Sequence, residues 1–320
     1  MAEMTDNTQE RKDKPLPHRH RLAPAAVARL MRFATYASTS VAVALVAAKL
    51  WAWSQTDSVS LLSSLIDSVL DLGASLVTLY AVHHAVQPAD REHRFGHGKA
   101  EALAGLGQAV FIAGSVVFLA LEAGRRLFIP HPVEDSDAGM LVILIALLLT
   151  GLLILFQRFV IQRTGSIAVS ADALHYQSDL LLNGSVLAGL YLSGHLGWTW
   201  ADPAFALIVA GIIAHSAWRI VGSSLDVLMD RELPDEDRRR IRQIASEHVG
   251  VDAVHDIRTR SSGTRVFIQL HLEMDGDKPL REAHALGDRV MYAVEAAYPN
   301  AEVLVHHDPV GEEEPPPRFT

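Results

Sequence analysis

The 320-residue chain contains no cysteine, which excludes disulfides and thiolate metal ligands. Any bound metal must therefore be held by histidine, aspartate or glutamate, which suit borderline and hard divalent ions better than Cu(I). A block of basic residues is also lacking, and 28 Lys and Arg against 37 Asp and Glu give a net charge of −9, which argues against a nucleic-acid partner. No glycine-rich nucleotide loop or catalytic-triad spacing occurs, which disfavours an ATP-driven pump or an enzyme.

Hydrophobic residues make up 49% of the chain, and they gather into stretches long enough to span a bilayer, which takes about 20 residues. Polar loops separate the stretches. The pattern predicts an α-helical membrane protein with six transmembrane helices. We place them at Phe33–Trp53, Val59–Val86, Ala100–Phe128, Ala138–Ile161, Ile167–Leu192 and Ala204–Leu228.

The distribution of lysine and arginine predicts the orientation of these helices, because short cytoplasmic loops carry an excess of both residues. The N-terminal tail, the Gln87–Lys99 loop, the turn before the fifth helix and the segment after the sixth fall on one side and carry most of them. We therefore expect both termini in the cytoplasm. Met1–Leu22 has no early apolar run, so we expect no cleaved signal peptide. Lys49, near the far end of the first helix, is expected to snorkel to the headgroups.

Two of the apolar stretches each carry a pair of potential metal ligands. Asp67 and Asp71 form one pair, and His175 and Asp179 form the other. Because each pair is spaced four residues apart, both members lie on one face of their helix. Such groups cost roughly 3 kcal/mol or more at membrane depth and usually face a partner or an aqueous cavity. Three carboxylates and one imidazole suit a tetrahedral Zn²⁺-like ion, so we predict divalent-metal transport. The alternative is that each aspartate is a packing or capping residue.

After Leu228 the sequence becomes polar and predicts a separate α+β domain. Pro234, followed by three acidic residues, marks a helix start, and later segments alternate as strands do. Helices and strands are placed at Asp235–His248, Val254–Arg260, Thr264–Met274, Pro279–Tyr298 and Ala301–His307. This order, α-β-β-α-β, predicts a small domain of the ferredoxin-like kind. From Gly311 the proline- and glutamate-rich end is expected to be disordered.

Five short motifs carry a resemblance to a known family. They are Asp67-Ser-Val-Leu-Asp71, the Gln87–Glu101 loop, His175-Tyr-Gln-Ser-Asp179, His255-Asp-Ile-Arg-Thr-Arg260 and His306-His307-Asp308-Pro309. With them the chain resembles the cation diffusion facilitator family, in its bacterial zinc and iron efflux branch, from the first helix to Pro309. The resemblance implies a homodimer in the cell inner membrane. Each protomer would exchange a cytoplasmic divalent cation for protons by alternating access.

The resemblance implies three metal sites. The transport site comprises Asp67, Asp71, His175 and Asp179, the four residues already singled out. A loop site comprises Asp90, His93 and His97, which one short turn could present together; the alternative is a solvated loop with incidental histidines. A binuclear zinc site at the dimer interface comprises His255, His271, His284, His306 and Asp308. Whether His307 is also a ligand stays open.

The resemblance further implies an ion pair between Lys99 and Asp230 that ties the membrane domain to the cytoplasmic domain. The alternative is two ordinary interfacial charges, which often contribute little. We divide the chain into a cytoplasmic N-terminal tail (1–30), a six-helix transport domain (31–230), a cytoplasmic metal-binding dimerisation domain (231–310) and a disordered tail (311–320).

Ligand chemistry predicts how such a transporter works. Metal binding needs deprotonated carboxylates and neutral imidazole, so protons compete with metal, and His175 is the best candidate to carry an exchanged proton. We expect Zn²⁺ as the main cargo, with Cd²⁺ or Fe²⁺ also carried and Zn²⁺ acting as a structural or regulatory ion; Mn²⁺, Co²⁺ or Fe²⁺ as the main cargo is an alternative. A membrane-anchored metal sensor is the alternative from another class, but a sensor would not need four ligands at membrane depth.

Overall fold

The structure is a computed structural model that describes residues 23–56, 59–128, 137–196 and 201–311. Residues 1–22 of the predicted N-terminal tail (1–30) and residues 312–320 of the predicted disordered tail (311–320) lie outside these ranges, whereas a helix already begins at Pro24. In the described residues the chain forms two compact units: a helical unit, Ala25–Leu228, and a sheet unit that starts at Met229. An α-helical membrane-type unit and a smaller unit with a sheet were predicted, and this part of the predicted fold class is confirmed.

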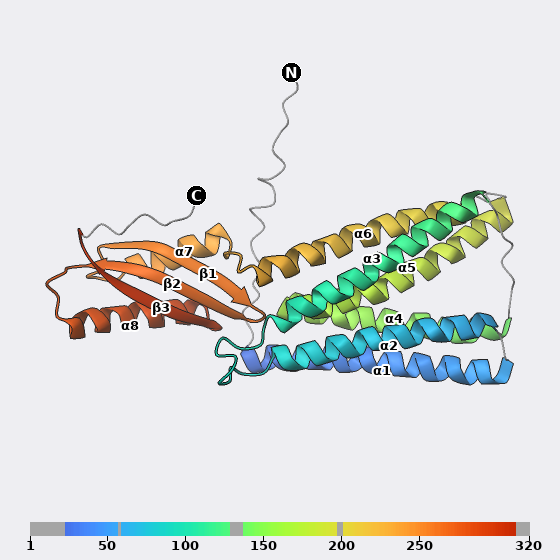
Figure 1. Cartoon of the computed structure of the whole chain (residues 1–320), viewed down its shortest axis with the longest axis horizontal. Helices are drawn as coiled ribbons and strands as arrows, with labels where there is room; N and C mark the ends of the chain where they lie inside the picture. The colour runs from blue at the N-terminus through green and yellow to red at the C-terminus, as the bar shows by residue number, and fades with distance from the viewer. Residues whose placement is uncertain (1–22, 57–58, 129–136, 197–200, 312–320) are drawn as a thin grey trace, which may run out of the picture. The chain divides into compact units, whose positions relative to one another are not determined.

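The helical unit contains long helices that run roughly along one direction (Figure 1). They are α1 (Pro24–Thr56), α2 (Val59–Ala85), α3 (Ala100–Phe128), α4 (Asp137–Thr164), α5 (Ile167–Leu196) and α6 (Ala201–Leu228). By length and composition, five of these described helices can cross a membrane: α1, α2, α3, α4 and α6. α5 is equally long, but Asp172, His175 and Asp179, with polar residues between them, lower the hydropathy of its first half.

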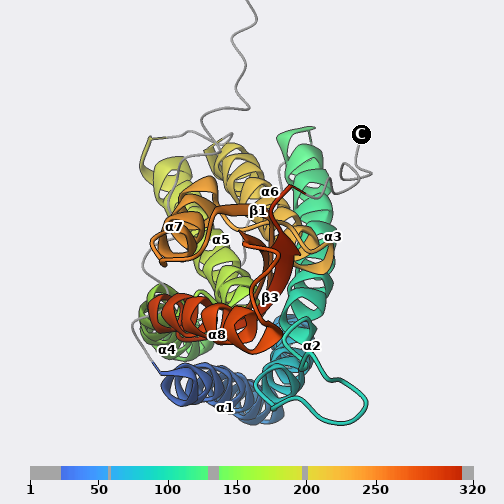
Figure 2. The same ribbon diagram turned by 90° about the vertical axis from the view of Figure 1, so that its left-hand side faces the viewer.

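The helices of this unit meet through small residues and buried apolar side chains. α3, α5 and α6 pack against one another, α2 contacts α3 and α5, and α4 contacts α5 (Figure 2). A Cβ on Gly105 would come within 2.7 Å of both Ile167 Cγ2 and Ser224 Oγ, so α3 approaches α5 and α6 because glycine has no side chain there. On the outer surface Val110 and Phe118 are 70% and 73% exposed, as lipid-facing side chains would be.

The turn between α4 and α5 fixes where α5 begins. Gly165, at φ +64°, takes the left-handed conformation that ends α4. Ser166 then caps α5, because its Oγ accepts a hydrogen bond from the backbone N–H of Val169 at 3.2 Å. The same hydroxyl donates to Glu101 Oε2 of α3 at 2.5 Å. This buried contact anchors α5, the helix that carries two predicted transport ligands, against α3.

The sheet unit contains two helices that cover one face of a three-stranded sheet (Figure 1). Its elements are α7 (Asp235–Ser246), β1 (Ala253–Ser262), β2 (Arg265–Met274), α8 (Leu280–Ala297) and β3 (Ala301–Pro309). The strand order is β1-β2-β3, with β1 antiparallel and β3 parallel to β2. Ile268, Leu270 and Leu272 of β2 are fully buried in the core formed with α7 and α8. Because side chains alternate along a strand, His271 lies on the opposite face.

Candidate metal sites

α2 and α5 bring together three of the four residues predicted for the transport site. His175 Nε2 lies 2.9 Å from Asp71 Oδ1 and 3.8 Å from Asp179 Oδ2. One donor atom from each of the three residues lies within 4.8 Å of the other two, so the group can hold a metal ion. The side chain of His175 is 6% exposed, whereas those of Asp71 and Asp179 are 25% and 39% exposed. The group therefore has a buried end and an open end.

Asp67 is exposed and lies outside this three-residue group. It precedes Asp71 by one turn of α2, so both carboxylates share a face of the helix. A tetrahedral ion held by the three gathered residues has one further position, which Asp67 or water would fill. The assignment of Asp67 as a ligand stays a prediction.

A buried polar network lies one turn from the transport-site histidine and joins four helices. Asp172 of α5 is 1% exposed, and its Oδ2 accepts a 2.7 Å hydrogen bond from Gln157 Nε2 of α4. Ser75 of α2 donates to the other carboxylate oxygen at 3.5 Å, and its hydroxyl also lies 2.9 Å from Tyr176 OH and 3.0 Å from Ser38 Oγ of α1. The network holds α2 and α5 in the register that brings the transport ligands together.

Lys49 does not follow the expectation that it would snorkel to the headgroups. Its Nζ donates to Ser68 Oγ at 2.7 Å and to the backbone oxygen of Ser64 at 3.0 Å, so the side chain turns toward α2. Two hydrogen bonds to a neighbouring helix satisfy an ammonium that would otherwise have to reach water. No sequence pattern indicated this contact, because the partners of Lys49 are a backbone oxygen and a serine hydroxyl.

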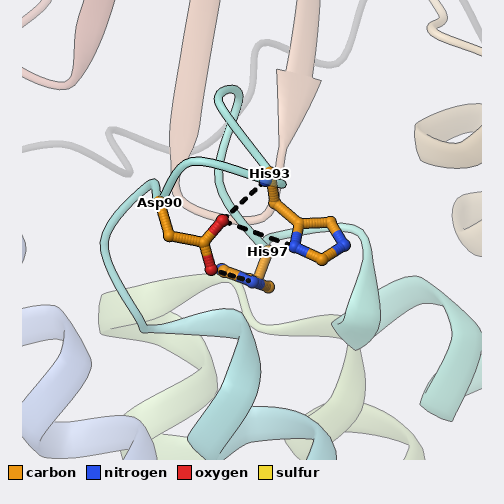
Figure 3. A group of neighbouring side chains, drawn as sticks. All are labelled: Asp90, His93 and His97. Atoms are coloured by element: carbon orange, nitrogen blue, oxygen red, sulfur yellow. Dashed lines mark hydrogen bonds and ion pairs between the residues drawn. The ribbon is translucent and has the colours of Figure 1, made fainter.

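The loop between α2 and α3 gathers all three residues of the predicted loop site (Figure 3). Asp90 Oδ1 lies 3.5 Å from His93 Nδ1, and Asp90 Oδ2 lies 3.4 Å from His97 Nε2. The same carboxylate accepts hydrogen bonds from the backbone N–H of His93 at 2.6 Å and of Glu92 at 2.9 Å. The bond from the His93 N–H is the main cause that lowers the pKa of Asp90, so the carboxylate is ionised and suited to a cation.

In the sheet unit, strand register lines up three histidines across the sheet. His255 of β1 pairs with His271 of β2, which pairs with His306 of β3. Asp308 meets all three: its Oδ2 lies 2.9 Å from His271 Nδ1 and 3.5 Å from His255 Nε2, and its Oδ1 lies 3.2 Å from His306 Nε2. His255, His271 and Asp308 form a group that can hold a metal ion.

His284, a predicted ligand, and His307, whose role as a ligand was left open, lie apart from this group. His284 is on α8, where its Nε2 lies 3.6 Å from Asp288 Oδ2, and its side chain is 71% exposed. His307 follows His306 on β3 and therefore points to the opposite face, toward α8. A Cβ on Gly287 of α8 would come within 2.2 Å of His307 Nε2, so glycine makes room for this imidazole. Burial is the main cause that lowers the pKa of His307.

Two carboxylates beside the histidine row were missed by the sequence analysis. Glu273 Oε1 lies 3.3 Å from His255 Nε2, and Asp256 Oδ2 lies 3.8 Å from His271 Nε2. Alternation along β2 could have indicated Glu273, which lies two residues after His271 on the same face. Asp256 sits at a bulge between His255 and Arg258, with φ +40°, and no sequence pattern marks that irregularity. The Arg258 guanidinium beside it holds the pKa of Asp256 below its usual range.

The predicted ion pair joins residues of different units, and each residue has a partner in its own unit. Lys99 Nζ donates to the backbone oxygen of Leu228 at 3.3 Å. Asp230 Oδ1 accepts from Arg260 Nη1 at 3.4 Å. A pairing between Lys99 and Asp230 stays a prediction.

Comparison with known proteins matches both units. The model of the cation efflux transmembrane domain matches residues 35–229, and that of the cation efflux protein cytoplasmic domain matches residues 233–310. The chain belongs to the cation efflux family. This confirms the family predicted from the motifs, and it makes the chain a multi-pass membrane transporter rather than an enzyme.

Members of this family from Yersinia are similar over most of their length. The cation-efflux pumps FieF of Yersinia enterocolitica (serotype O:8, biotype 1B) and of Yersinia pestis (strain Pestoides F) are each 48% identical over 282 residues, covering 88% of this chain and 94% of the relative. Among solved structures, the zinc form of CzrB is 38% identical, covering 27% of this chain and 99% of that one, with a TM-score of 0.26.

Proposed function

We propose that this protein exports divalent metal cations from the cytoplasm across the inner membrane, with Zn²⁺ as the main cargo and Cd²⁺ and Fe²⁺ as further cargo. The observation that carries the proposal is the group Asp71, His175 and Asp179, two carboxylates and an imidazole gathered between long helices of the membrane domain. Ionisable groups at membrane depth mark ion pathways. The FieF relatives, named cation-efflux pumps, support the direction of transport.

Export is proposed to be coupled to proton entry. His175 Nε2 and Asp71 Oδ1 lie at hydrogen-bonding distance, so a proton held between them occupies the position that metal would take. Metal binding requires both atoms to be deprotonated, so proton and metal compete for the same donors. When the group faces the cytoplasm, metal displaces protons from it, and when it faces a more acidic far side, protons displace the metal. His175 carries one of the exchanged protons.

The proposed architecture has six membrane crossings with both termini in the cytoplasm. We include α5 as a crossing in addition to the five helices that qualify by length and composition. Its polar residues lower its hydropathy, but Asp172 and His175 are buried among the neighbouring helices rather than turned to lipid. The proposed domain division keeps residues 31–230 in the transport domain and residues 231–310 in a ferredoxin-like cytoplasmic domain. Because α1 begins at Pro24, residues 24–30 of the predicted N-terminal tail (1–30) join the transport domain, and the tail at residues 311–320 stays a prediction.

The cytoplasmic domain is proposed to form a homodimer and to hold zinc as a structural or regulatory ion. His255, His271 and Asp308 would supply the ligands, since imidazole and carboxylate donors at these separations suit Zn²⁺. His284 and His306, whose side chains are 71% and 63% exposed, are accessible to a second ion beside a second copy. The ion would offset the negative charge of Asp308 and Glu273 where two acidic surfaces meet.

The test is metal flux in proteoliposomes that contain only this protein. Zn²⁺, Cd²⁺, Fe²⁺, Mn²⁺ and Co²⁺ are each offered with and without an imposed pH gradient, and vesicles without protein give the background. We expect Zn²⁺ flux that rises with the gradient and falls when a protonophore collapses it. Flux without a gradient effect would contradict proton coupling. Metal binding without any flux would contradict transport and favour the membrane-anchored sensor. If Mn²⁺ or Co²⁺ is carried faster than Zn²⁺, that ion, and not Zn²⁺, is the main cargo.

A further inference from the structure

Lys49 is the only lysine within α1–α6, and it is bonded to another helix. Its ammonium reaches from α1 to α2 and donates to Ser68 Oγ at 2.7 Å and to the backbone oxygen of Ser64 at 3.0 Å. On a hydrated surface, water would satisfy the three N–H donors of a lysine ammonium without any of these bonds. Two short bonds to a neighbouring helix therefore hold the charge in a defined place.

That place is the face of α2 that carries the transport carboxylates. Ser64, Ser68 and Asp71 are spaced i, i+4 and i+7, so they lie along one face of the helix, and Asp67 directly precedes Ser68. Asp71, Asp67 and Asp179 all lie within electrostatic range of the Lys49 charge. One fixed cation thus accompanies three carboxylates.

The count of charges gives this arrangement a function. The four predicted ligands, three ionised carboxylates and a neutral imidazole, carry −3, and a divalent ion among them leaves −1. Asp172 is not counted, because it lies outside the ligand group and its two oxygens accept hydrogen bonds from Gln157 and Ser75. A net charge enclosed between membrane helices is unfavourable, so the loaded site needs one more positive charge before it can close away from water. Resting on the function proposed above, we infer that Lys49 is the fixed countercharge of the transport site: it neutralises the metal-loaded site and limits how tightly the ion is held.

This role has a consequence that a packing role does not share. A fixed cation repels the bound metal, which weakens binding but speeds release. Even at the dielectric constant of water, repulsion between one charge and a divalent ion at about 8–10 Å, the usual spacing of packed helices, amounts to roughly fivefold in affinity, and it is larger where water is excluded. Removing the charge should therefore tighten binding and slow turnover together. Removing a mere packing contact should slow turnover without tightening binding.

The experiment measures initial rates of Zn²⁺ entry into proteoliposomes against Zn²⁺ concentration, for wild type, Lys49→Gln and Lys49→Arg. Glutamine keeps a donor that can reach Ser68 but removes the charge, and arginine keeps the charge. We expect Lys49→Gln to lower KM by roughly fivefold or more and also to lower Vmax, while Lys49→Arg keeps both close to wild type. Melting temperature, measured in parallel, reports on folding.

The outcomes separate this inference from the proposed function. If wild type carries no Zn²⁺, the proposed function fails. If wild type carries Zn²⁺ but KM of Lys49→Gln is unchanged or raised, or if Lys49→Arg behaves like Lys49→Gln, the countercharge role is overturned and the transport role stands. Should Lys49→Gln not fold, Ser68→Ala decides the matter, since it frees the ammonium to move away. A lowered KM then supports the inference and an unchanged KM overturns it.

Discussion

The transport group and the histidine row of the sheet unit use the same donors but are assembled differently. Asp71, His175 and Asp179 come from two helices, and each helix orients its ligands by its own 3.6-residue period. His255, His271 and Asp308 come from three strands and meet only because the register of the sheet aligns them. The first arrangement is local to two helices, whereas the second requires the whole sheet.

The surroundings of the two groups differ as well. His175 is nearly buried, and the polar groups around it are a defined set that includes Asp172 and Lys49. In the sheet unit, His255 is 32% exposed, and Glu273 lies 3.3 Å from its Nε2. Loss of one ligand should therefore greatly weaken metal binding in the transport group, whereas in the sheet unit a neighbouring carboxylate should partly compensate for it. Variants that each remove one ligand can test this difference in tolerance between the two groups.

Asp71→Ala should abolish Zn²⁺ flux, by roughly 100-fold or more, while the protein stays folded and dimeric. Removing a direct ligand should cost at least as much as removing an outer partner of a ligand, which typically costs about 10–100-fold. It also removes the cost of burying a carboxylate, so stability should not decrease. Zinc flux per dimer and melting temperature are measured side by side.

The matched control for Asp71→Ala is Asp308→Ala, which removes the carboxylate of the sheet group and should keep most of the flux. Equal losses in the two variants would contradict the difference drawn between the two groups. Preserved flux in Asp71→Ala, or a loss explained by misfolding, would show that Asp71 is not a transport ligand.

His175→Asp should lower the ratio of Zn²⁺ to Mn²⁺ flux by about tenfold, because an all-oxygen site suits harder ions. The pH dependence of flux should weaken or move to lower pH, since imidazole is the donor that ordinarily titrates nearest neutrality. Both cations are compared in the same vesicles at several pH values. An unaltered ratio would show that His175 does not determine selectivity.

Zinc should dimerise and stabilise the isolated Pro234–Val310 fragment, which keeps every buried residue of the sheet unit's core cluster except Leu233. At about 100 times the dissociation constant, binding adds about 2.7 kcal/mol to the free energy of unfolding. His271→Ala should lose most of this gain, because His271 contacts Asp308 at 2.9 Å. Sedimentation and thermal melting with and without Zn²⁺ provide the measurement, and His248→Ala, which changes a half-buried histidine outside the row, is the control. Identical profiles with saturating zinc would contradict the site.

The difference in assembly also explains what the sequence could predict. Pairs four residues apart indicated Asp71, His175 and Asp179 directly, because helical spacing is visible in the sequence. The row His255, His271 and His306 was reached only through the family resemblance, since register between strands has no local signal. Lys49 was predicted wrongly because snorkelling considers one helix alone, and the contact with Ser68 depends on how α1 and α2 pack.

The smallest expected effect lies away from both groups, where the sheet unit holds α7 against α8. Tyr298 OH donates to Asp237 Oδ1 at 3.1 Å, and burial, followed by the Asp237 charge, raises the pKa of Tyr298 above its usual range. A raised pKa means that the fold favours the neutral phenol. This contribution to stability is fully present below about pH 10, the ordinary value for tyrosine, and is lost as pH rises toward the folded pKa.

Tyr298→Phe in the Pro234–Val310 fragment should therefore lower the free energy of unfolding by about 1 kcal/mol, or roughly 5 °C in melting temperature. As pH rises above 10 the variant and wild type should converge, because tyrosine then ionises in the unfolded state of the wild type and this stabilises that unfolded state. The zinc-dependent gain should be the same in both, since Tyr298 follows α8 and packs against the core, whereas the histidine row lies on the other face of the sheet. A smaller zinc gain in the variant would mean that the metal group depends on the packing of α7 and α8, and that the sheet alone does not assemble it.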